Sequence, residues 1–143
     1  MKKLITYVLV VLLICSLVLP AYADEEEPPV QGEEIEEYVN IRTATIYLNI
    51  ATNGTTTVNI TCVGLTGTTH ISSRTYLEKW NGSSWSRVSF NGASEIVDGV
   101  SAISMTRTYT TTVGSGQYRA TTIFTVTRGT DETITVYSST VTH

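Results

Sequence analysis

Few side chains in this chain are of the types that perform catalysis, and their spacing does not indicate an active site. A Ser-His-Asp or Cys-His arrangement would have to use His70, because the other histidine of this sequence is its final residue, His143. His70 does not lie in a turn of the kind that presents a nucleophile. The sequence also contains no Gly-rich phosphate loop, no paired-histidine motif and no Cys-x-x-Cys motif. We therefore predict that the protein is not an enzyme, with no catalytic residue and no cofactor.

The acidic side chains of the second half of the chain offer two further possibilities. A glycosidase needs two carboxylates that face each other across a cleft, and Glu95 and Asp98 are the best pair available. If the strands alternate in direction, the loops 64–69, 91–99 and 128–132 lie at one end of the domain. Five ionisable side chains would then meet there: His70, Glu95, Asp98, Asp131 and Glu132. Carboxylates on adjacent loops could bind Ca²⁺, but no known calcium loop is present, so we predict solvated turn residues and no metal site.

Aromatic and charged residues around an Asn-Gly turn are the best candidates for a binding site. Trp80 and Trp85 flank the four residues Asn-Gly-Ser-Ser, which predicts a hairpin with the two tryptophans opposite each other. The same register predicts the pairs Glu78–Arg87, Leu77–Val88 and Thr75–Phe90. The face directed away from the core then carries Tyr76, Glu78, Trp80, Trp85 and Arg87. Exposed aromatic rings beside charges are typical of binding surfaces, including those for sugars, although a tryptophan pair can also simply cover a sheet.

The elements that must position these residues are all predicted to be β-strands. Residues 38–143 contain alternating Thr, Val, Ile and Tyr, have no proline, and show no helical periodicity. We predict seven strands, at 40–51, 56–63, 70–80, 85–90, 100–109, 117–127 and 133–141. This spacing indicates an all-β fold, an antiparallel β-sandwich of the immunoglobulin-like or fibronectin type. Thr-x-Thr recurs along the chain without a regular repeat, so we expect no threonine array of the ice-binding kind.

The first predicted hairpin places a cysteine in the core. Alternating apolar residues predict the facing pairs Ile50–Val58, Leu48–Ile60 and Ile46–Cys62. This register requires a loop with an odd number of residues, such as Asn53-Gly54-Thr55. Cys62 then acts as a small hydrophobic residue. It is the only cysteine outside the N-terminal apolar segment, so we predict no intramolecular disulfide.

The N-terminal part of the chain differs from the rest in composition. Residues 1–23 combine Met-Lys-Lys, the apolar run Leu4–Leu19 and a small-residue ending, as in a secretory signal peptide. The run is shorter than the roughly 20 residues that span a bilayer, so we predict cleavage, no stable membrane span, and a secreted or cell-surface-associated product. Residues 24–37 hold eight acidic and no basic side chains (−8), which predicts a disordered leader. The β-sandwich domain, 38–143, holds seven basic and five acidic side chains (+2).

Motifs late in the chain resemble those of immunoglobulin-fold proteins. Gly116-Gln-Tyr-Arg-Ala resembles the Gly-x-Tyr-x-Cys of strand F, with Ala120 in place of the cysteine. Tyr118 would then be the corner tyrosine that bonds back to the preceding loop, and Cys62 would stand where the other half of the disulfide lies. The wider pattern adds Ile46-Tyr-Leu, Tyr76-Leu-Glu-Lys-Trp-Asn-Gly-Ser-Ser-Trp and Tyr137-Ser-Ser-Thr. As a whole it resembles small secreted proteins of Gram-positive bacteria, a family of unknown function, and it implies a sandwich fold and secretion.

These observations predict a secreted, non-enzymatic module of unknown function. Its expected partner is an extracellular protein or glycan, bound through Tyr76, Trp80, Trp85 and Arg87. The alternative is a structural, self-associating protein of the matrix or envelope, because the predicted edge strands are rich in Thr, with few charges and no proline. A small secreted effector or inhibitor is a third class. Nucleic acid is not expected as a partner, because the domain is only weakly basic and the leader would repel phosphate.

Overall fold

The computed structural model describes residues 38–143, and the predicted signal peptide and acidic leader lie outside the described residues. All regular elements of this part are β-strands. They are β1 (Ile41–Ile50), β2 (Thr55–Gly64), β3 (His70–Trp80), β4 (Trp85–Val88), β5 (Ile96–Val100), β6 (Ser104–Thr112), β7 (Gln117–Arg128), β8 (Thr130–Tyr137) and β9 (Val141–Thr142). No helix in this part of the chain has the length and apolar character needed to cross a membrane.

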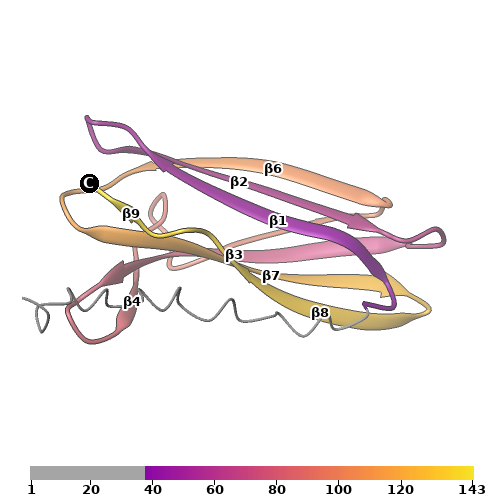
Figure 1. Cartoon of the computed structure of the whole chain (residues 1–143). Coiled ribbons are helices and arrows are strands. Elements are labelled where there is room, and N and C mark those ends of the chain that lie inside the picture. The colour runs from indigo at the N-terminus through magenta and orange to yellow at the C-terminus, as the bar shows by residue number, and fades with distance from the viewer. Residues whose placement is uncertain (1–37) are drawn as a thin grey trace, which may run out of the picture. The chain divides into compact units, whose positions relative to one another are not determined.

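The strands form two antiparallel sheets that pack face to face (Figure 1). The first sheet has three strands in the order β1-β2-β6, and the second is built around the central pair β3 and β7. One edge of β3 is shared, because β5 pairs with its first half and β4 with its last residues. In the same way β8 and β9 share the other edge of β7. The prediction of an all-β antiparallel sandwich is therefore confirmed.

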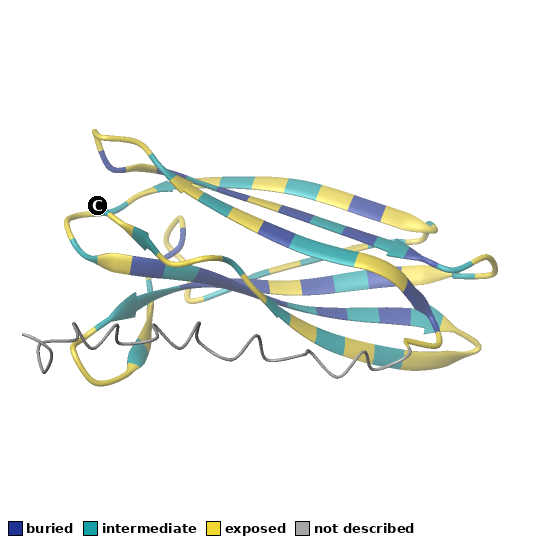
Figure 2. Ribbon diagram, in the orientation of Figure 1, coloured by how far each residue is buried: buried dark blue, intermediate teal, exposed yellow. Residues whose placement is uncertain are grey.

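A single hydrophobic core lies between the two sheets. Alternate residues of β2, β3 and β7 point inward and are buried, which Figure 2 shows as alternating bands along the strands. The largest fully buried side chains are Phe90, Phe124, Ile60, Ile71, Leu77, Met105, Val58 and Val126. Cys62 is also fully buried, as predicted. Because the low-dielectric surroundings disfavour the thiolate, burial raises the pKa of its thiol to about 11.

The first hairpin has the predicted inward faces but not the predicted register. The observed pairs are Ile46–Ile60, Leu48–Val58 and Ala44–Cys62. The loop is odd, as predicted, but it consists of residues 52–54 and not of residues 53–55. The N–H of Gly54 donates to the carbonyl of Ala51 at 2.8 Å, and Gly54 has a φ of 80°. Glycine tolerates this left-handed conformation, so the strand resumes at Thr55.

The prediction that residues 91–99 form a loop is wrong, because this segment contains most of the strand β5. The sequence Asp98-Gly99 resembles a turn signal, and this hid the alternation of Ile96, Asp98 and Val100. In the structure Thr75 pairs with Ile96 of β5 and not with Phe90. Phe90 instead forms a single bridge with Ala93 beyond the end of β4.

Two other predicted strands also have different bounds. The segment predicted at 100–109 divides between the end of β5 and β6, which begins at Ser104. The segment predicted at 133–141 is divided between β8 and β9, because the chain leaves the edge of β7 after Tyr137 and returns at Val141. The N–H of Ser138 donates to the carbonyl of Ala120 at 2.9 Å and marks the point of departure.

Tyr118 closes the turn that leads into β7. Its hydroxyl donates to the carbonyl oxygen of Gly114 at 3.0 Å, and its ring is buried in the core. The prediction that this tyrosine bonds back to the preceding loop is therefore confirmed. The ammonium of Lys79 lies 5.5 Å from the ring centroid and donates to the carbonyl of Ser115, which holds the same turn against β3.

Replacing Tyr118 with Phe should destabilise the protein by about 1 kcal/mol, because it removes one hydrogen bond and keeps the buried ring. Urea unfolding followed by tryptophan fluorescence measures the change. Tyr47→Phe is the matched control, since Tyr47 is exposed, and it should leave the free energy of unfolding unchanged. Equal stability of Tyr118→Phe and the unmodified protein would show that the bond does not hold the turn.

The buried thiol of Cys62 predicts a loss of stability at alkaline pH. Its pKa is raised from 9.0 to about 11, so between these values the unfolded state releases a proton that the folded state keeps. The free energy of unfolding should therefore fall as the pH rises through this range, by up to about 3 kcal/mol. Cys62→Ala, although less stable at neutral pH, should lack this part of the decline. Parallel pH profiles for the two proteins would contradict it.

Candidate functional site

The four predicted binding residues share the outer face of the second sheet. Tyr76 and Trp80 belong to β3, and Trp85 and Arg87 belong to β4. The predicted hairpin register is confirmed for the pairs Trp80–Trp85, Glu78–Arg87 and Leu77–Val88. The two tryptophan rings lie with their centroids 5.3 Å apart and their planes tilted by 55°. The four-residue loop is held by Asn81, whose side-chain oxygen accepts from the N–H groups of Ser83 and Ser84.

Two residues that sequence analysis missed complete this surface. Arg119 of β7 is paired with Glu78 of β3, and Tyr137 of β8 is paired with Thr121 of β7. The guanidinium carbon of Arg119 lies 4.6 Å from the ring centroid of Trp85 and 4.7 Å from that of Tyr137. We name the whole surface the aromatic–arginine face, and it consists of Tyr76, Trp80, Trp85, Arg87, Arg119 and Tyr137.

The three predicted rings, Tyr76, Trp80 and Trp85, are less exposed than the sequence suggests, whereas Tyr137 is 55% exposed. The guanidinium carbon of Arg87 lies 3.8 Å from the ring centroid of Tyr76, and Tyr76 is only 9% exposed. The two tryptophans are half-buried. The expectation of a row of exposed rings is therefore wrong for Tyr76, because an arginine covers it. Such stacked contacts are attractive, since the cation meets the negative face of the ring.

The ion pairs on this face do not follow the cross-strand pairing of β3 with β4. Glu78 accepts from Arg119 Nε at 2.7 Å and from the Thr121 hydroxyl at 2.9 Å. Both partners lie on β7, so the carboxylate turns toward that strand and away from Arg87. Arg87 lies 3.4 Å from Glu95, which is also 3.7 Å from Arg74. A carboxylate between two arginines at these distances is held loosely.

Glu95 and Asp98, the predicted carboxylate pair, do not share a cleft. Glu95 reaches Arg74 and Arg87 on the outer face of the sheet. Asp98 is paired with Ser73, a buried position of β3, and therefore points to the opposite side. The alternation of side chains along a strand separates residues three positions apart, and the pair cannot act together on one substrate.

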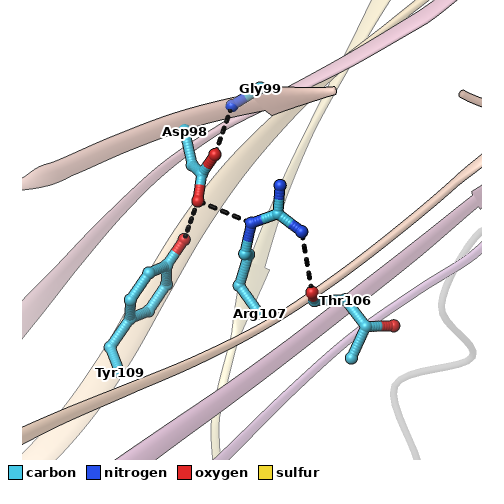
Figure 3. A network of polar contacts seen from close by, with 5 residues as sticks. All are labelled: Asp98, Gly99, Thr106, Arg107 and Tyr109. Atoms are coloured by element: carbon cyan, nitrogen blue, oxygen red, sulfur yellow. Dashed lines mark hydrogen bonds and ion pairs between the residues drawn. The ribbon is translucent and has the colours of Figure 1, made fainter. Parts of the chain in front are cut away.

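Asp98 instead connects the two sheets at their edge (Figure 3). Arg107 Nε of β6 donates to Asp98 Oδ2 at 2.7 Å, and the N–H of Gly99 donates to Oδ1 at 2.7 Å. The hydroxyl of Tyr109 lies 3.5 Å from the same carboxylate. The bond from Arg107 is the main reason that the pKa of Asp98 is lowered, because it favours the ionised form. Burial raises the pKa of Tyr109.

The predicted gathering of ionisable side chains at one end of the domain is wrong. Glu132 accepts from the backbone N–H groups of Val39 and Asn40 at 2.8 and 2.7 Å, and Asp131 accepts from the Thr127 hydroxyl at 2.7 Å. Pairing of β5 along β3 sets Ile96 opposite Thr75 and so takes Glu95 away from that end. Within residues 38–143 there is no group of three His, Cys, Asp or Glu side chains that could hold a metal ion.

His70, the only candidate for a catalytic base, begins β3 and is exposed. Its imidazole packs over Gly99, where a Cβ would lie 3.3 Å from Nε2. The glycine thus provides the space for the ring at the edge of the sheet. His70 therefore lies in the position of a surface side chain that packs against the edge of the sheet.

The outer face of the first sheet has a different chemistry. Its outward side chains are Thr43, Thr45, Tyr47 and Asn49 of β1, Thr55, Thr57, Asn59, Thr61 and Val63 of β2, and Ser104, Thr106, Thr108, Thr110 and Thr112 of β6. We name it the threonine face, and none of these side chains carries a charge. Pairing aligns Thr45, Thr61 and Thr106 in one row. This row arises from strand register, and the next row contains Tyr47 and Asn59 in place of threonine.

Comparison of the chain with protein-family models, with curated proteins and with solved structures finds no match. The site must therefore be interpreted from its own residues.

The ion pair between Asp98 and Arg107 predicts a specific dependence of stability on acid. The pKa of the folded carboxyl lies below its usual 3.8, so the pair stabilises the folded state above that value. This contribution is lost as the pH falls through the lower pKa of the folded state. The stability advantage over Asp98→Asn, measured by urea unfolding, should be constant at mildly acidic pH and should shrink below pH 3.8. An advantage that persists unchanged in stronger acid would exclude the ion pair as its source.

Proposed function

We propose that this chain is a secreted, non-enzymatic binding module that recognises an extracellular glycan or protein through the aromatic–arginine face. The observation that carries the proposal is the stacking of Arg119 between Trp85 and Tyr137, on the side of the sheet away from the core. Aromatic residues and arginine are the side chains most enriched at the centres of binding surfaces. Here they come from four strands and meet on one sheet.

The rigidity of these side chains supports a role in recognition. Arg119 is fixed by two rings and by Glu78, and only 26% of its side chain is exposed. Arg87 lies over one ring, that of Tyr76, with its guanidinium carbon 3.8 Å from the ring centroid. A binding surface whose long side chains are already ordered loses less conformational entropy when a ligand binds. Side chains that only cover the apolar surface of a sheet do not need to be fixed in this way.

We further propose that the sandwich is immunoglobulin-like. The orders β1-β2-β6 and β3-β7-β8 correspond to strands A-B-E and C-F-G of that fold, and β4 and β5 lie beside β3. The bond from Tyr118 to Gly114 corresponds to its tyrosine corner. Cys62 and Ala120, at the positions of the usual disulfide, are both buried in the core. The sequence resemblance to small secreted proteins of Gram-positive bacteria agrees with this assignment.

The remaining observations favour binding over catalysis and secretion over retention. The signal-peptide pattern of residues 1–23 directs the product out of the cell. Glu95 and Asp98 point to opposite sides of their strand, and His70 packs over a glycine. These placements give the three side chains local structural roles. None of these roles accounts for the aromatic–arginine face, and a binding function would account for it.

A structural, self-associating role is the second candidate, and the uncharged threonine face is the observation in its favour. The edges of the sheets argue against it. Arg107 on the edge strand β6 and Asp98 on the edge strand β5 point inward and pair with each other. Inward-pointing charges are one of the devices that keep edge strands from pairing with other chains. The sequence alone had indicated edges without such protection.

The double variant Trp80→Ala/Trp85→Ala should lose the ligand and keep the fold. Protein produced from the full chain is incubated with cell-wall material, extracellular polymers and culture medium, and the retained partners are identified. Tyr47→Ala is the matched control, because it removes an exposed ring from the threonine face. It should retain the same partner, and circular dichroism should show native β-structure for both variants. A partner retained equally by the tryptophan variant would refute the proposed face, and growth in sedimentation coefficient with concentration would favour self-association.

A further inference from the structure

We infer that the ligand is an acidic glycan, and that Arg74 and Arg87 bind the carboxylate of its sugar units. The inference rests on the proposed function, since it names the ligand of the same face. It follows from three features of the outer surface of the second sheet: how the rings are covered, how the arginines are paired, and where the surface is hollowed.

The stacking of arginines on the aromatic rings indicates which kind of ligand this face can bind. Arg87 lies over Tyr76, and Arg119 lies between Trp85 and Tyr137. Those ring surfaces are thus occupied, and a neutral sugar could not stack on them. A guanidinium that lies flat on a ring keeps its N–H groups at the edge, where they form a planar fork that matches a carboxylate. The face is therefore better suited to an anion than to a neutral ring.

The arginines differ in how completely they are neutralised. Arg119 has a short bond to Glu78, and only 12% of the Glu78 side chain is exposed. By contrast, Arg74 and Arg87 share the single carboxylate of Glu95 at 3.7 and 3.4 Å, and their side chains are 55% and 47% exposed. Two guanidinium groups with one distant carboxylate leave one positive charge and several N–H donors unused. A ligand carboxylate can take up these donors without breaking a strong bond.

A hollow next to Arg74 indicates that the anion is attached to a sugar. The hollow is about 190 Å³ in volume and is lined by Ser72, Ser73, Arg74, Val97, Ile123 and Thr125. It is smaller than the roughly 300–1,000 Å³ of common small-molecule sites, and it fits one unit of a chain and not a whole oligosaccharide. Hydroxyl groups beside apolar side chains suit the alternating polar and apolar surface of a pyranose.

The geometry of the sheet provides room for a polymer. Arg74 and Trp80 lie on the same face of β3, six residues apart, which corresponds to about 20 Å. A glycan chain can therefore place one acidic unit at the hollow while another reaches the half-buried tryptophans. Individually weak contacts repeated along one chain add up through their high effective concentration.

Polygalacturonate and its methyl ester test this inference, because the two polymers share a backbone and differ in charge. Binding is measured by affinity electrophoresis and calorimetry with protein produced from the full chain. We expect polygalacturonate to bind and the fully methylated polymer not to bind. Arg74→Gln and Arg87→Gln should each weaken the binding about tenfold, the effect of one lost charge-assisted hydrogen bond. Arg42→Gln, which removes an exposed charge from β1, is the matched control and should change the affinity little.

Four results would overturn the inference: no binding of polygalacturonate, equal binding of its methyl ester, an equal loss in Arg42→Gln, or equal binding of polyglutamate. The last would indicate charge recognition of a protein segment. The proposed function fails separately. If a partner is lost in the Trp80/Trp85 variant but kept by both arginine variants, the face is a binding site and only the acidic-glycan assignment is wrong.

Discussion

The antiparallel pairing of β3 with β7 is the constraint on which the rest of the structure depends. Its register runs without a break from His70–Thr127 to Lys79–Tyr118, so the inward residues of both strands form the centre of the core. The same register decides what meets on the other side. It sets Glu78 beside Arg119 and thereby brings a β7 arginine against a ring of β4. A slip of one residue would exchange the two faces and disrupt the core and the aromatic–arginine face together.

Aromatic rings position two of the arginines on the outer surface of this sheet. Guanidinium groups lie over aromatic rings, and they differ in how closely a carboxylate is bonded to them. Where the carboxylate is well bonded, as at Glu78, the pair is structural. Where one carboxylate serves two exposed arginines, as at Glu95, the site retains capacity for an external anion. The difference in geometry between these two glutamates, and not the number of charges, distinguishes scaffold from site.

Features that depend on residues close together in the sequence were predicted correctly. Features that depend on which distant strands pair with each other were missed. The hairpin from Tyr76 to Arg87 was predicted in register because its turn and its alternation lie within a few residues. The corner bond of Tyr118 was predicted from a local motif. Arg119 and Tyr137 were missed because their place beside Trp85 depends on which strands are neighbours, and local periodicity does not contain that information. β5 was missed because Asp98 appears unsuitable for a strand until Arg107, on another sheet, neutralises it.

The two outer faces of the sandwich differ in charge and in hydrogen bonding. On the threonine face the side chains are uncharged and bond to each other across strands, as Thr108 does to Asn59 at 2.7 Å. Thr61 and Thr106 form a second bond of this kind, at 3.3 Å. On the outer surface of the second sheet, Arg74 and Arg87 share the single carboxylate of Glu95, so their donors exceed the acceptors of their ion pairs. Because a polar ligand can bind such unused donors, we place the proposed recognition on the second sheet, while the first sheet covers the core from the other side.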